Sequence, residues 1–219
     1  MERVIEAYNT IYQGGVDEIV MKKSRFISSV LPAETEEEAL SCIDSIKKKN
    51  WNASHNCYAY IIGTQNPIMR CSDDGEPSQT AGKPMLDVLI AKELTNLVVV
   101  VTRYFGGTLL GTGGLVKAYQ SATIAGLDQS IIIMKELGIH IQIITDYNLV
   151  GKIQYYISQE NFPMLSSDYT DIVTMDLVVP VDKMDSFYNK LADLSNGSLL
   201  PIELKKVYFA VIEDKVHLF

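Results

Sequence analysis

Glycines and basic residues gather between an apolar run and a helical pattern in the segment Thr102–Tyr119, TRYFGGTLLGTGGLVKAY. Such a strand-to-helix junction suits an anion, because glycines let backbone N–H groups approach a ligand and the helix presents the positive end of its dipole. The spacing matches neither a dinucleotide fingerprint nor a P-loop, since Thr112 stands where the P-loop has lysine. A tight structural turn is the alternative. The predicted anion-binding residues are Arg103, Gly106, Gly107, Gly111, Gly113, Gly114 and Lys117.

Three carboxylates lie within four positions, at Asp73, Asp74 and Glu76. They could act as acids or bases or bind a divalent ion, but their spacing is not that of an EF-hand and also fits a solvated turn. His55 stands two residues before Cys57, so the two could form a base and nucleophile pair or pack as core neighbours. The possible acid–base residues are therefore His55, Asp73, Asp74 and Glu76, and we predict no metal and no cofactor.

A short basic segment, Lys22-Lys23-Ser24-Arg25, separates two β-rich runs at 18–21 and 26–31 that read as a hairpin. Lys22, Lys23 and Arg25 join the candidate anion or nucleic-acid contacts. The lysines at 47–49 end a predicted helix, where they complement the helix dipole, so they are not counted as a nucleic-acid patch.

The chain has 219 residues and a net charge of −8, and it is acidic on both sides of Leu137. Nucleic-acid binding would therefore need a local basic patch. Three cysteines without a Cys-x-x-Cys pair indicate reduced thiols, and the apolar run 97–101 is far shorter than a membrane span. We expect a cytoplasmic protein with no membrane partner.

Apolar spacing in the first part of the chain predicts alternating helices and strands. Thr35 and Glu38 form a capping-box pattern at the start of a helix to about residue 49. The run 97–101 is continuously apolar, which indicates a strand buried on both faces. The other predicted elements are a strand at 56–62, a helix at 84–93 and a helix at 115–125 that ends at Gly126.

From Gly138 onward the pattern becomes βαββαβ, which predicts a ferredoxin-like domain. Asp182 is expected to cap its second helix, and Asn196-Gly197 is expected to end that helix. The predicted elements are strands at 139–144, 164–169, 172–179 and 202–211, with helices at 149–158 and 184–194.

Four motifs carry a family resemblance: KKSRF at 22–26, ASHNCYAY at 53–60, SDDGEPSQTAGKPML at 72–86 and VVVVTRYFGGTLLGTGGLVKAY at 98–119. Together they resemble the Impact/YigZ family. The resemblance implies an α+β protein. Its N-terminal α/β sandwich, residues 1–135, would be of the type shared by a ribosomal protein and domain four of elongation factor G, and its ferredoxin-like domain, 138–219, would be similar to domain five of that factor. The motif positions it implies are Lys23, Arg25, His55, Asp73, Asp74, Glu76, Arg103 and the loop glycines.

The resemblance also implies a link to translation. Our leading hypothesis is a cytoplasmic, non-enzymatic, translation-associated regulatory protein that binds RNA or the ribosome through Lys22, Lys23, Arg25, Arg103 and the glycine loop. One alternative is a hydrolase or transferase acting on a phosphorylated small molecule, with the loop holding the phosphate. Another is a protein-interaction module whose partners are other proteins, for which the acidic C-terminal domain is the main support.

Overall fold

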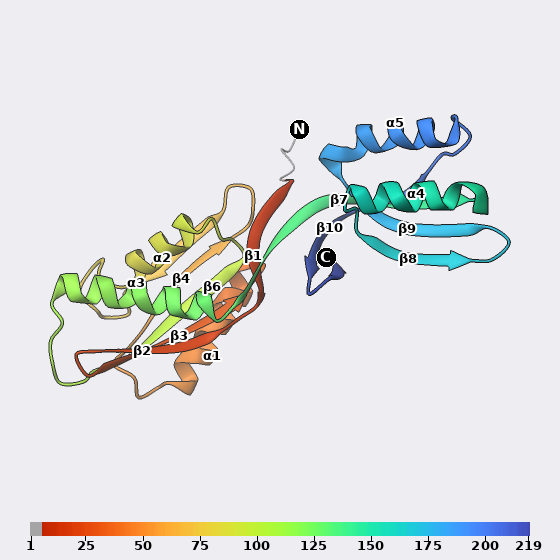
Figure 1. Ribbon diagram of the computed structural model, residues 1–219. Helices are drawn as coiled ribbons and strands as arrows, with labels where there is room; N and C mark the ends of the chain where they lie inside the picture. Colours follow the sequence, from red (N-terminus) through yellow and green to blue (C-terminus); the bar gives the residue numbers. More distant parts are fainter. Residues whose placement is uncertain (1–5) are drawn as a thin grey trace. The chain divides into compact units, whose positions relative to one another are not determined.

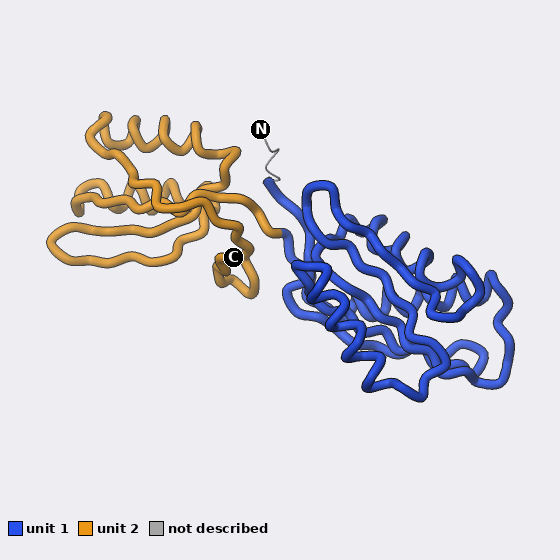
Figure 2. The backbone as a smooth tube through the Cα atoms, turned by 180° about the vertical axis from the view of Figure 1, so that it is seen from behind, with its two compact units in different colours: residues 1–134 blue, residues 135–219 orange. Residues whose placement is uncertain are grey.

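The computed structural model describes residues 6–219, and the chain divides into two compact units, 1–134 and 135–219 (Figures 1 and 2). Both units combine a β-sheet with helices, so the α+β class is confirmed. Within the described residues, no α-helix has both the length and the apolar composition that crossing a bilayer requires.

The first unit is built on a five-stranded antiparallel sheet, counted over residues 6–134, with strand order β2-β3-β6-β4-β5. The predicted hairpin is confirmed as β2 and β3. The edge strand β5 and the strand β1, which pairs with β7, were not predicted. The bounds are β1 Ala7–Gln13, β2 Val16–Met21, β3 Ser24–Pro32, β4 His55–Ile62, β5 Ile68–Ser72, β6 Leu97–Tyr104 and β7 Ile131–Thr145.

Helices cover both faces of this sheet: α1 (Glu36–Lys49) lies on one face, and α2 (Gly82–Ala91) and α3 (Thr112–Asp128) lie on the other. The central strand β6 shows why. Its Val98 and Val100 pack in the cluster that contains α1 residues, whereas Val99 and Val101 pack in the α2 and α3 cluster. Side chains alternate along a strand, so a continuous apolar run supplies two cores, and the prediction of a strand buried on both faces is confirmed.

Local sequence sets the start of α1, whereas packing against the sheet explains the glycine near the end of α3. Thr35 caps α1 as predicted, accepting a hydrogen bond from the Glu38 N–H at 3.1 Å. The prediction that the third helix ends at Gly126 is wrong, because α3 continues to Asp128. A Cβ at Gly126 would collide with the Ser28 side chain on β3, so this glycine allows close helix-to-sheet packing and does not terminate the helix.

The second unit has the ferredoxin-like strand order β10-β7-β9-β8, and β11 extends the sheet beyond β10. Helices α4 and α5 pack on one face of this sheet. Asn196 and Gly197, both at positive φ, end α5 as predicted. Asp182 does not cap α5, because it lies within a short 3₁₀ turn, 181–183, that precedes the helix. The bounds are α4 Tyr147–Gln159, β8 Met164–Tyr169, β9 Val173–Pro180, α5 Met184–Ser195, β10 Ile202–Ile212 and β11 Lys215–Leu218.

Candidate functional site

Four loops meet at one end of the first unit's sheet, which we call the loop end: residues 22–23, 50–54, 73–81 and 105–111. Strand register places them together. Arg25 pairs with Tyr104, and His55 pairs with Arg103, so β3 and β4 begin beside the residues where β6 ends. Figure 1 shows this end of the sheet beside the start of α3. The loop end therefore gathers most of the residues that the sequence singled out.

A buried ion pair lies beneath the loop end. Arg103 is 5% exposed, and its Nη1 donates to Oε1 of Glu76 at 2.5 Å. The Tyr119 hydroxyl donates to the same oxygen at 2.8 Å, and the Arg103 guanidinium lies 5.4 Å from the centre of the Phe26 ring. The guanidinium therefore faces a carboxylate inside the protein, and an anion in the solvent would have to displace Glu76 to form the expected fork.

His55 is held at the edge of this ion pair. Its Nδ1 lies 2.9 Å from the carbonyl oxygen of Asp74. A carbonyl only accepts hydrogen bonds, so Nδ1 carries the proton and donates it. The other ring nitrogen, Nε2, lies 3.9 Å from Oε2 of Glu76. The nitrogen that does not donate to Asp74 therefore faces the Glu76 carboxylate at the edge of the pocket.

A pocket of about 380 Å³ joins these side chains to the glycine loop. Its polar wall is formed by the predicted residues His55, Glu76 and Arg103. Its apolar wall comes from the loop and from the start of α3, through Phe105, Leu109, Leu110 and Leu115. The structure therefore brings the predicted arginine, one predicted acid, the histidine and the loop into one cavity.

The other two predicted acids serve the fold. Asp73 accepts hydrogen bonds from the backbone N–H groups of Gln79, Ala81 and Gly82 at 2.8–2.9 Å, which holds the start of α2. Asp74 accepts from Lys47 at 2.8 Å and from the Asn56 N–H at 2.7 Å. Within residues 6–219, no three His, Cys, Asp or Glu side chains gather as a metal site would require.

Cys57 is unsuited to act as a nucleophile. It is fully buried, and its Sγ lies 3.0 Å from the Asp73 carbonyl oxygen and 3.3 Å from the Tyr119 hydroxyl oxygen. Burial raises the pKa of the Cys57 thiol to about 12, so at neutral pH it is protonated. Burial also raises the pKa of Tyr119. Of the two sequence interpretations of His55 and Cys57, the geometry favours core packing for the cysteine.

The lysines of the β2–β3 turn lie directly beside the glycine loop. Lys22 and Lys23 are exposed and both have positive φ, as a two-residue hairpin turn of this kind requires. A Cβ at Gly106 would collide with the backbone of Lys23, and the Gly106 N–H donates to the Ser24 hydroxyl at 3.1 Å. Glycine at this position thus lets the loop pack on the turn.

Arg25 lies on the other face of the sheet. It donates two hydrogen bonds to Glu18, at 2.8 and 2.7 Å, and its guanidinium lies 5.6 Å from the centre of the Tyr104 ring. Neighbouring residues of a strand point to opposite faces, and Phe26 points toward Arg103. The structure therefore places Arg25 away from the pocket, although it lies at the same end of the sheet as Arg103.

The start of α3 is open to solvent. Gly107 and Gly111 have φ values of 80° and 74°, which glycine adopts without strain. No side chain caps the helix among the described residues, and a Cβ at Gly113 would meet no atom within 4 Å. Gly114 packs against Leu110, and Lys117 is exposed in the same helix. Uncapped N–H groups at a helix start are the donors that anions use.

Two exposed aromatic side chains at the loop end escaped the sequence analysis. Trp51 is 82% exposed and Phe105 is 49% exposed. No periodic pattern marks them. The sequence signals that could have identified Trp51 are that it is the single tryptophan of the chain and that it lies between two asparagines, Asn50 and Asn52, after a predicted helix.

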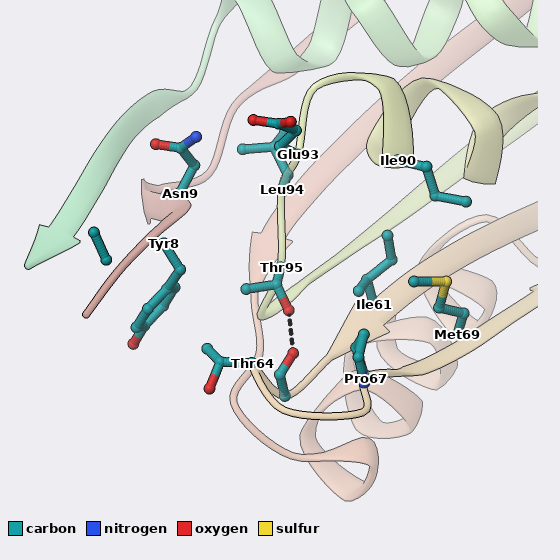
Figure 3. A pocket seen from close by; sticks show the side chains of 12 residues that line it. Tyr8, Asn9, Ile61, Thr64, Pro67, Met69, Ile90, Glu93, Leu94 and Thr95 are labelled. Carbon is teal, nitrogen blue, oxygen red and sulfur yellow. Dashed lines mark hydrogen bonds between the residues drawn. The ribbon is translucent and has the colours of Figure 1, made fainter. Parts of the chain in front are cut away.

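A second pocket, of about 320 Å³, lies at the opposite end of the same sheet, where Ile61 pairs with the first residue of β6 (Figure 3). Apolar side chains such as Ile61, Met69 and Ile90 form most of its wall. The Thr95 hydroxyl donates to the Gly63 carbonyl at 2.6 Å, and among residues 6–219 Glu93 is the one acidic residue that lines the pocket. Within the described part of the chain, no histidine, cysteine or basic residue lines this pocket, so it offers no base, nucleophile or phosphate-binding cation.

Comparison with known proteins agrees with this architecture. Residues 22–127 match the Impact N-terminal domain, and residues 143–198 match a domain of unknown function, DUF1949. The chain is 39% identical to IMPACT family member YvyE of Bacillus subtilis, over 89% of each chain. It is 37% identical to IMPACT family member YigZ of Escherichia coli, over 84% of this chain and 90% of the relative.

A solved structure described as the crystal structure of an hypothetical protein is also similar. It superposes with a TM-score of 0.58 at 33% identity, and the match covers 92% of this chain and 99% of that one. Sequence and structure therefore agree over both units, and the chain belongs to the IMPACT family.

Proposed function

We propose that this protein is a cytoplasmic, translation-associated regulatory protein that binds RNA, free or within the ribosome, through the loop end. The family resemblance supplies the link to translation, and local charge carries the argument for RNA. The stretches 22–25, 73–77 and 103–117 together hold five Lys or Arg and three Asp or Glu, whereas the whole chain is acidic. The three cysteines are free thiols, as in a reducing compartment.

The carboxylates of these stretches are already engaged by internal partners. Asp73 accepts three backbone N–H groups, Asp74 pairs with Lys47, and Glu76 pairs with Arg103. Among residues 6–219, by contrast, no ion pair ties Lys22 or Lys23 to a carboxylate. The charge that remains available to a ligand is therefore positive, which attracts phosphates.

The geometry of the turn and loop suits a phosphate backbone. The lysines of the β2–β3 turn lie beside Gly106, and the loop leads to the uncapped start of α3. Lysine ammonium groups and helix N–H groups are two common kinds of phosphate donor. In this arrangement Arg103 positions Glu76 and the pocket wall, and the exposed lysines and N–H groups contact the RNA.

Co-sedimentation with ribosomes and with purified ribosomal RNA at low salt tests the proposal. We expect the wild-type protein to sediment with at least one of them and Lys22→Gln/Lys23→Gln to remain largely in the supernatant. Lys205→Gln/Lys206→Gln removes the same charge from exposed positions of the second unit and is expected to sediment like the wild type. Wild-type protein that stays in the supernatant in both assays would overturn the proposal.

A second candidate function rests on the 380 Å³ pocket, in which His55 Nε2 faces Glu76. An enzyme could bind a phosphorylated small molecule at the start of α3 and use His55 as its base. Such a ligand raises the melting temperature by mass action. If this candidate is right, at least one nucleotide or sugar phosphate should raise the melting temperature, and His55→Ala should reduce that rise. If no compound of the panel changes the melting temperature, the candidate is excluded.

A further inference from the structure

Trp51 lies on the protein surface without an internal role. Its side chain is 82% exposed, and no hydrogen bond or ring contact of the indole is found among residues 6–219. Tryptophan is the largest apolar side chain and is usually highly buried, so nearly complete exposure is unusual. Folding of the chain gives no reason for tryptophan at this position.

The backbone that carries Trp51 is nevertheless well fixed. The Asn50 N–H and side-chain amide both donate to the Ile46 carbonyl, at 2.9 and 3.0 Å, and the Ala53 N–H donates to the Asn50 carbonyl at 3.0 Å. The Tyr104 hydroxyl lies 3.1 Å from the Asn50 amide oxygen and 3.4 Å from that of Asn52. The residues on both sides of Trp51 are thus tied to the fold, so little backbone entropy is lost when the ring binds a ligand.

Phe105 is a second exposed ring beside this loop. It follows Tyr104 in sequence, and its N–H donates to the Ser54 hydroxyl at 3.2 Å, so the loop that carries Trp51 contacts it. The Arg103 guanidinium lies 5.5 Å from the centre of the Phe105 ring, yet 49% of the residue is exposed. The end of β6 therefore presents one aromatic ring, Phe105, and through Tyr104 holds the loop that carries the other.

We propose that Trp51 and Phe105 each stack on an unpaired base, which makes single-stranded RNA the ligand of the loop end. This inference rests on the proposed function, in which Lys22 and Lys23 contact phosphates. Exposed aromatic rings set among cations are typical of single-strand binding, because every base has a face that can stack. In a duplex the bases are already stacked and such rings find none.

The surroundings of Trp51 favour a nucleic acid over a protein partner. Lys48 and Lys49 complement the dipole at the end of α1, but the structure also leaves both exposed just before the Trp51 loop, so their charge can still attract a phosphate. Lys22 and Lys23 lie at the same end of the sheet. Protein interfaces are depleted of lysine around their central aromatic residues, whereas a phosphate backbone requires cations close to the stacked bases.

Intrinsic fluorescence tests the inference directly, because Trp51 is the single tryptophan of the chain. The full-length protein is titrated at low salt with a single-stranded RNA oligonucleotide and with the same sequence as a duplex. We expect the single strand to quench the fluorescence and to bind more tightly than the duplex. By anisotropy of labelled RNA, Trp51→Ala should lose roughly five- to hundredfold in affinity for the single strand, and Trp51→Phe should keep most of it.

Tyr155→Ala serves as the matched control, because Tyr155 is also an exposed aromatic residue (68%) and lies in the second unit. Its RNA affinity should equal that of the wild type. If Trp51→Ala binds single strands as tightly as the wild type while binding stays salt-dependent, the inference fails and the RNA-binding proposal stands. If neither strand form binds the wild type at low salt, both fail. A loss of affinity in Tyr155→Ala equal to that in Trp51→Ala would also overturn the inference.

Discussion

Replacing Arg103 with methionine should destabilise the first unit by about 3–5 kcal/mol, the usual cost of removing one partner of a buried ion pair. Arg103 is 5% exposed and Glu76 is 8% exposed, so the remaining carboxylate would stay buried without its cation. Methionine keeps an unbranched stem beside Phe26, which limits the loss of packing. For a unit of this size, the loss corresponds to a fall in melting temperature of roughly 10–20 °C.

Scanning calorimetry measures this loss, and a double-mutant cycle assigns it to the pair. In Glu76→Gln the amide oxygen can still accept from Arg103 and Tyr119, so a smaller loss is expected. The double variant should lose less than the two single losses combined, by about 1–3 kcal/mol. At a temperature where Arg103→Met is folded, its RNA affinity should match the wild type. A variant that melts like the wild type but loses RNA affinity would refute this reasoning and make Arg103 a ligand contact.

Three further expectations concern stability and reactivity. Gly126→Ala should destabilise α3 by about 1–3 kcal/mol in urea unfolding, because the clash with Ser28 outweighs a helix-propensity gain of at most about 1 kcal/mol. Gly113→Ala, whose Cβ points into open space in the same helix, should instead leave stability unchanged or raise it by up to about 1 kcal/mol. Because the pKa of Cys57 is raised, the folded protein keeps a thiol proton that the unfolded chain releases above about pH 9. The free energy of unfolding should therefore fall between pH 9 and 12, by up to about 1.4 kcal/mol per pH unit for this group. In Cys57→Ala, urea unfolding across this pH range should show a smaller fall in the free energy of unfolding. A thiol reagent near neutral pH should modify exposed Cys71 in the native protein and Cys57 only after unfolding; equal rates would contradict the burial of Cys57.

Much of the fold was predictable because its patterns are local. The apolar run of β6 and the βαββαβ order of the second unit both follow from spacing alone. The edge strand β5 was missed because four of its five residues are exposed, so no alternation of apolar and polar residues marks it. Gly126 was misread as a helix end because its role depends on Ser28, which is distant in sequence.

The candidate site was predictable in its members but not in their pairing. Sequence placed Arg103 beside the glycine loop and left its partner open, since Glu76 meets it only through the register of β4 with β6 and the course of the loop after β5. That Arg25 and Arg103 point to opposite faces of the sheet could likewise be predicted only with the exact register of β3 and β6. Trp51 was missed because exposure cannot be read from a single aromatic residue in a loop.

The salt dependence of RNA binding tests the central claim most directly, because the slope of log affinity against log salt counts phosphate contacts. For a single-stranded RNA, Lys22→Gln/Lys23→Gln should weaken binding and reduce the slope by about 1.4, at about 0.7 per lost contact. Lys205→Gln/Lys206→Gln should leave the slope of the wild type unchanged. Equal slopes in all three proteins, or no wild-type binding at low salt, would contradict the assignment of the loop end as an RNA-binding surface.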